Sequence, residues 1–90
     1  MVEPSDGTRL WLVERDYDDR GLVRLVYATP DGCSHLRKEL SGAALRRSAV
    51  TAATTVDTDR LEPVDDPDTR ERYAAEADRM RSSHAPGDEV

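Results

Sequence analysis

The sequence predicts an α+β domain: an antiparallel sheet of three or four strands, arranged as a meander, with a C-terminal helix packed on it. Three observations support this fold class. Three short runs with strand character are separated by brief connections. The second connection contains Pro30-Asp31-Gly32, a turn-forming triplet. Asp66 followed by Pro67 is a helix-start signal, and it opens a long segment near the C-terminus.

The meander consists of three predicted strands, at residues 8–15, 22–29 and 33–40. A polar loop at residues 16–21 joins the first two. In the second connection Pro30 fixes φ, Asp31 can accept hydrogen bonds from the backbone, and Gly32 can adopt a positive φ, which predicts a tight turn with a bulge. Because both connections are short, consecutive strands should pair antiparallel.

The chain after the meander leaves two alternatives open at residues 41–47, which form either a short helical turn capped by Ser41 or a crossing loop. Residues 48–56 alternate Val and Thr and predict a fourth strand. A turn-rich link at 57–63 follows. Asp66 as the N-cap and Pro67 at the first helical position then begin a helix that should extend to about Ser82.

These elements fit one small domain at residues 8–82, with a flexible lead-in at 1–7 and a disordered tail at 83–90. No run approaches the roughly 18 apolar residues that a membrane-spanning helix needs, and the N-terminus lacks a signal-peptide pattern. The single cysteine excludes an internal disulfide. We therefore expect a cytoplasmic protein without a membrane partner.

The charged residues are unusual: 12 Asp, 7 Glu and 12 Arg accompany a single Lys, Phe is absent, and the formal net charge is −6. Surface carboxylates hold water and cations, and negative charge keeps a protein soluble where salt screens it. This composition predicts the cytoplasm of a salt-accumulating organism and non-specific cations at an acidic surface. A GC-rich genome is the alternative, but codon bias alone does not create net acidity.

Both faces of the predicted sheet carry apolar side chains. If Val13 lies opposite Val23, one face holds Trp11 and Leu25, whereas an antiparallel sheet with one wet face should alternate apolar and polar residues. One helix can cover one face only, so we expect the other to bind a second copy of the chain or a larger protein. The candidate protein interface consists of Leu10, Leu12, Leu22 and Val26. The alternative is a monomer in which residues 41–64 close both faces.

Cys33 and His35 are two positions apart on the predicted third strand, so their side chains should share a face. As a catalytic dyad the pair lacks an orienting third group, and as metal ligands it lacks the three or four donors that zinc needs. We interpret it as a small buried thiol beside a polar histidine. We expect no catalytic residue, no metal ligand and no cofactor.

Two charged clusters have structural explanations. Asp16 and Asp18 match the first and third positions of a calcium loop, but Tyr27 stands where the last carboxylate is needed. Arg37-Lys38 and Arg46-Arg47 are basic, yet a nucleic-acid surface needs a continuous basic patch, often with aromatic side chains for stacking. We expect a solvated hairpin loop and ion-paired arginines.

Three strings in the chain are similar to a family of small, acidic, uncharacterised haloarchaeal proteins: residues 8–15 (TRLWLVER), 27–32 (YATPDG) and 69–77 (TRERYAAEA). The resemblance covers about residues 8 to 80. The family has no assigned activity, cofactor or site, so no functional residue is carried over. What the resemblance implies is a salt-rich cytoplasm.

As a function we expect a small, non-catalytic protein-interaction module that is homodimeric or docks to a larger protein. One alternative is a nucleic-acid-associated accessory module, which clustered basic residues beside an exposed Trp11 would favour. The other is a small enzyme that uses Cys33 and His35, which a pocket containing both residues and an aspartate would favour.

Overall fold

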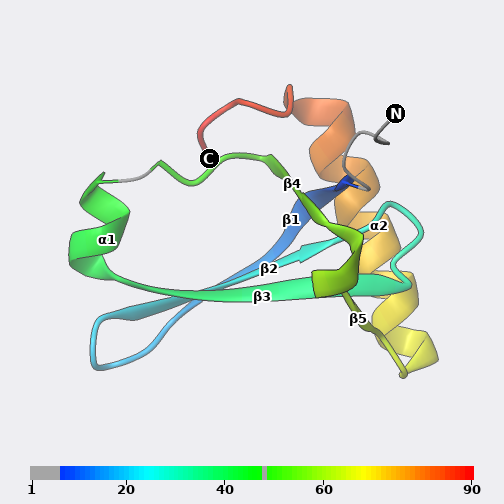
Figure 1. The fold of residues 1–90 in the computed structure, drawn as a ribbon, viewed down its shortest axis with the longest axis horizontal. Coiled ribbons are helices and arrows are strands. Elements are labelled where there is room, and N and C mark those ends of the chain that lie inside the picture. Colours follow the sequence, from blue (N-terminus) through cyan, green and yellow to red (C-terminus); the bar gives the residue numbers. More distant parts are fainter. Residues whose placement is uncertain (1–6, 48) are drawn as a thin grey trace, which may run out of the picture.

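The computed structural model describes residues 7–47 and 49–90 and contains one antiparallel sheet with two α-helices at opposite ends of the molecule (Figure 1). The strands are β1 (Gly7–Tyr17), β2 (Leu22–Ala28), β3 (Ser34–Ser41), β4 (Ala53–Asp57) and β5 (Glu62–Pro63). The helices are α1 (Gly42–Arg47), the 3-10 helix η1 (Thr58–Arg60) and α2 (Pro67–Ser83). The strand order is β4-β1-β2-β3-β5. The predicted α+β class is confirmed, but the sheet has five strands, not three or four.

The β1–β2 connection is tighter than predicted, because β1 continues through Asp16 and Tyr17. The Asp18 carboxylate accepts hydrogen bonds from the backbone N–H groups of Arg20 (2.8 Å) and Leu22 (3.1 Å). Gly21 has a φ of +84°, which glycine adopts without steric penalty. The Asp18 side chain thus organises a short turn, and the two preceding residues remain in the strand.

A β-bulge in β1 decides which side chains share a face. Tyr17 lies opposite Val23. The register then shifts by one residue between Glu14 and Leu12, so that Leu12 lies opposite Tyr27. The sequence-based pairing of Val13 with Val23 is therefore wrong. An extra residue in one strand moves all later side chains to the other face. For this reason Leu10 and Leu12 share a face with Tyr27, and Trp11 shares the opposite face with Ala28.

The helix face of the sheet is the one covered by α2. Its buried residues form two adjoining clusters with residues of α2 and of nearby loops: Trp11, Ala52, Ala53 and Ala77, and Val26, Ala28, Val64 and Tyr73. The small side chains let α2 approach closely, and the predicted packing of this helix on the sheet is found. The N-cap is also as predicted, since the Asp66 carboxylate accepts a hydrogen bond from the N–H of Thr69 (2.9 Å).

The concave face is the opposite side of the sheet and is closed by the chain itself. Its buried cluster is Leu10, Leu12, Val23, Leu25, Tyr27 and Val50, with Val56 and Leu61 packed against it. β4 and β5 lie at opposite edges, yet only residues 58–61 separate them. In a flat sheet β4 and β5 would lie four strand spacings apart, which is about 19 Å. The five residue steps from Asp57 to Glu62 span at most about 18 Å when fully extended, and they span less here because they include the 3-10 helix η1. The sheet must therefore curl around this face.

The segment after α2, expected as a disordered tail, instead lies beside the residues that lead into β4 (Figure 1). Ala52 donates its N–H to the oxygen of Asp88 (2.8 Å), and Val90 donates to the oxygen of Val50 (2.9 Å). Val90 also packs against both the concave-face cluster and the cluster around Trp11. Backbone groups of the residues that lead into β4 thus hydrogen-bond to the C-terminal segment. This pairing between distant backbone segments leaves no pattern in the sequence.

Residues 41–47 adopt the first of the two alternatives, a short helix, and the N–H of Ala44 donates to the Ser41 hydroxyl (3.1 Å). The predicted fourth strand is shorter than expected and begins at Ala53, while Ser48 lies outside the described residues. Most of the expected lead-in, residues 1–6, also lies outside them. Among the helices described, none combines the length and apolar character needed to cross a membrane.

Candidate functional site

The predicted interface residues do not form one surface. Leu10 and Leu12 are 0% and 4% exposed on the concave face, whereas Val26 is 3% exposed on the helix face. Leu22 is partly buried at the start of β2. The bulge in β1 separates the set, and residues 50–61 cover the face that was expected to need a partner. Three of the four side chains are thus already buried within one chain.

Cys33 and His35 are not arranged as a pair. Cys33 belongs to the β2–β3 turn and is exposed, with its sulfur 3.7 Å from the backbone oxygen of Asp31, so the prediction of a buried thiol is wrong. His35 is buried in β3 with 8% exposure. Its ring centroid lies 6.3 Å from that of Tyr73, and its Nε2 is 3.9 Å from Glu62 Oε1. Because β3 begins only at Ser34, Cys33 remains in the turn and its thiol lies outside the sheet.

A cleft of about 280 Å³ lies beside His35 where β3 and β5 meet the start of α2. The Nδ1 atom of His35 is buried without a hydrogen-bond partner among the described residues. The Asp66 carboxylate accepts hydrogen bonds from the N–H and the hydroxyl of Thr69. Both bonds lower the pKa of Asp66, and the bond from the hydroxyl has the larger effect. The lining residues are His35, Arg37, Pro63, Val64, Asp65, Asp66, Thr69 and Tyr73. Cys33 is not among them, so the cleft lacks the nucleophile of the enzyme alternative.

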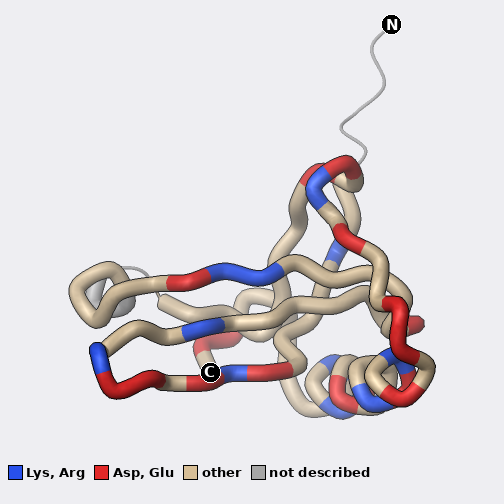
Figure 2. The backbone as a smooth tube through the Cα atoms, turned by 90° about the horizontal axis from the view of Figure 1, so that it is seen from below, with Lys and Arg blue, Asp and Glu red and all other residues tan. Residues whose placement is uncertain are grey.

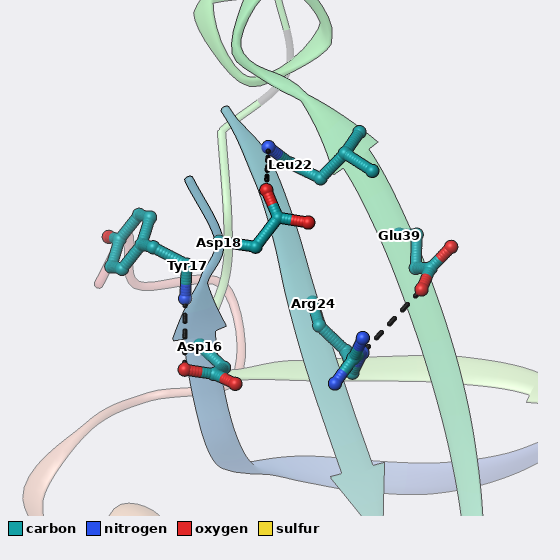
Figure 3. A pocket seen from close by; sticks show the side chains of 6 residues that line it. All are labelled: Asp16, Tyr17, Asp18, Leu22, Arg24 and Glu39. Carbon is teal, nitrogen blue, oxygen red and sulfur yellow. Dashed lines mark hydrogen bonds and ion pairs between the residues drawn. The ribbon is translucent and has the colours of Figure 1, made fainter. Parts of the chain in front are cut away.

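A smaller hollow of about 70 Å³ lies at the β1–β2 turn (Figure 3). The Asp18 carboxylate points to the backbone N–H of Leu22, and this bond, with that from Arg20, lowers the pKa of Asp18. Arg24 Nε lies 3.5 Å from Glu39 Oε2. Within residues 7–47 and 49–90, no group of three or more His, Cys, Asp and Glu side chains could hold a metal ion. The carboxylates here order the turn and pair with Arg24.

The basic residues do not assemble with Trp11. Trp11 is only 4% exposed beneath α2, so it is not available for stacking. Arg37 and Lys38 are neighbours in β3 and therefore point to opposite faces of the sheet. The side chains of Arg46 and Arg47 lie outside what the structure describes. The arrangement that would favour a nucleic-acid module is therefore missing its aromatic component.

The outer edge of β3 is the feature that sequence reasoning missed. β5 pairs only with Ser34 and His35, and no other strand of the described chain pairs with this edge from Leu36 to Ser41. In Figure 1, β5 covers only one end of the long strand β3. Edge strands are templates for adding a further strand. Alternation of apolar and polar residues along a strand does not show whether that strand lies at the edge of a sheet, because strand order is set by pairing between distant segments.

Comparison with known proteins finds one family model that matches almost the whole chain. The family of unknown function DUF7967 matches residues 4–90. No curated protein and no solved structure matches the chain. This chain therefore belongs to DUF7967, a family whose function is unknown.

Proposed function

We propose that this protein is a small, non-catalytic protein-interaction module that acts as a homodimer. The observation that carries the proposal is the unpaired outer edge of β3, from Leu36 to Ser41, in a sheet whose two faces are already covered. Backbone N–H and C=O groups at such an edge can accept another strand without displacing any element of the fold. Burial of apolar faces is not needed for this association.

The absence of catalysis in this proposal rests on how the polar side chains of the described residues are used. Asp18 and Asp31 hold turns, Asp66 caps α2, and Arg24 pairs with Glu39. General acid–base or nucleophilic chemistry needs a reactive group within hydrogen-bond reach of a second group that activates it. The Cys33 thiol instead contacts the backbone oxygen of Asp31.

The proposal places the dimer in the cytoplasm of a salt-accumulating organism. The supporting evidence is the composition: acidic residues outnumber basic ones by 19 to 13, and 12 of the 13 basic residues are Arg. An acidic surface binds hydrated cations and remains soluble when salt screens its repulsion. Acidic and basic residues are intermixed along the strands and α2, which limits repulsion between two copies (Figure 2).

The homodimer is tested by light scattering on the full chain after size-exclusion chromatography, over a concentration and salt series. We expect a particle with twice the mass of the 10.0 kDa chain that dissociates on dilution. A 10.0 kDa particle at every concentration and salt level would overturn the proposal.

A further inference from the structure

We propose that the two copies join along the outer edges of their β3 strands, antiparallel and centred on Lys38. This inference rests on the proposed homodimer and specifies its surface. The strand segment Leu36-Arg37-Lys38-Glu39-Leu40 is self-complementary in this orientation. The occupant of the edge is thus a second copy of the same segment.

The backbone of β3 presents the required groups. Cys33 directs its C=O to the outer edge, where it accepts the N–H of Val64 (2.8 Å), the residue after β5. Ser34 instead directs its C=O towards the N–H of Thr29 (3.0 Å) on the β2 side. Because the direction alternates along a strand, Arg37 and Glu39 direct their N–H and C=O groups to the open edge. If Arg37 lies opposite Glu39 of the second copy, each exchanges both bonds with its partner. The two-fold arrangement then contains four backbone hydrogen bonds.

The side chains match in the same register. Arg37 meets Glu39 of the other copy twice on the helix face, and Leu36 meets Leu40 twice on the concave face. Leu36 and Leu40 are partly buried against the concave-face cluster, so each retains exposed apolar surface that the second copy can cover. Cross-strand pairs of opposite charge and of apolar residues stabilise an antiparallel sheet. Charges usually protect an edge from pairing, but here their order favours one register.

The available length also fits. β5 occupies the edge at Ser34 and His35, and the chain leaves the strand at Gly42, where α1 begins. The self-complementary segment of five residues lies between these two limits. In this register Ser41 of the second copy comes opposite His35, where β5 already occupies the edge, so the added pairing ends at Leu36 and Leu40.

One pair in this register is unfavourable. Lys38 lies opposite Lys38 of the second copy, and like charges directly opposite one another destabilise a sheet. This pair makes no backbone hydrogen bonds, so its side chains lie closer together than those of the flanking pairs. We therefore expect a dimer that dissociates readily, and one that Lys38→Thr tightens.

The test is a charge-exchange experiment on the full chain, with dimer dissociation constants from sedimentation equilibrium. Arg37→Glu and Glu39→Arg each replace both opposite-charge pairs with like-charge pairs. We expect each variant alone to dissociate at least about tenfold more easily, which corresponds to about 1.4 kcal/mol. In a one-to-one mixture the two glutamates of the first variant lie opposite the two arginines of the second. We expect native mass spectrometry to find this heterodimer in excess of both homodimers.

The matched controls are Arg79→Glu and Glu71→Arg, which make the same charge changes at exposed positions of α2. They should leave the dissociation constant unchanged. Recovery of dimer in the mixture also shows that the single variants are folded. If both variants dimerise like the unmodified chain and the mixture shows no preference, the dimer uses another surface and this inference is wrong. A monomeric unmodified chain would instead overturn the proposed function itself.

Discussion

The two turns of the meander have the same local conformation but different surroundings. Gly21 and Gly32 have φ values of +84° and +74°. No described atom lies within 4 Å of the position that a Cβ at Gly21 would take. A Cβ at Gly32 would overlap the carbonyl oxygen of Arg70 and lie 2.9 Å from the nitrogen of Ala74, both in α2. The first glycine only allows the chain to turn, whereas the second also allows a hairpin to pack on a helix backbone.

Aspartate orders both turns in a similar way. Asp18 accepts backbone N–H groups of Arg20 and Leu22, and Asp31 accepts the hydroxyl of Thr29 (2.6 Å) and the N–H of Cys33 (2.9 Å). Local hydrogen bonding is thus comparable in the two turns. The difference between them comes from tertiary contact, and substitutions at matched positions can measure it.

The largest effect is expected for Gly32→Ala. A positive φ costs alanine about 1–2 kcal/mol, and relief of the overlap requires α2 to move away from the sheet. We expect the free energy of unfolding to fall by more than about 3 kcal/mol, a large part of the about 5–15 kcal/mol typical of a small domain. Urea titration followed by circular dichroism measures this. A loss near 1 kcal/mol would show that the turn does not pack on α2 in solution.

Gly21→Ala is the matched substitution at the open turn. The added methyl group has free space, so only the backbone conformation is penalised. We expect a loss of about 1 kcal/mol in the same urea titration. If it destabilises the protein as much as Gly32→Ala, the β1–β2 turn must pack on something that a single copy of the chain does not contain.

The smallest effects are expected from acid titration. Bonds from Thr29 and Cys33 hold the pKa of Asp31 below its ordinary value of 3.8, and bonds from Leu22 and Arg20 do the same for the pKa of Asp18. Each carboxylate therefore stabilises the fold above about pH 4, and this contribution is lost as the pH falls from 3.8 towards the lowered folded pKa.

Asp31→Asn and Asp18→Asn should each remove part of this acid dependence. Urea titrations at a series of pH values measure this. Near neutral pH each variant should have a lower free energy of unfolding than the unmodified chain, and in acid this difference should become smaller. Two variants that follow the unmodified chain in parallel from neutral to acid pH would show that these bonds do not persist in solution. Ser82→Ala, at an exposed position of α2, is a suitable control, since it changes no charged side chain.

Local signals predicted most elements of this fold. Asp66 and Pro67 mark the start of α2, Gly32 takes the positive φ expected of the second turn, and the three meander strands lie within two residues of their predicted bounds. These features depend on side chains close in the chain, which cap a helix, hold a turn or alternate along a strand. The sequence alone could therefore determine them.

Tertiary structure decided the features on which the proposed function rests. One bulged residue in β1 reversed the faces of Leu10 and Leu12, and pairing between distant segments placed β4 and β5 at opposite edges. Leu10, Leu12 and Val26 of the predicted interface are consequently buried within one chain, and the outer edge of β3 is left open from Leu36 to Ser41. Register and strand order depend on which distant segments pair, and a local pattern of apolar residues is compatible with several such pairings.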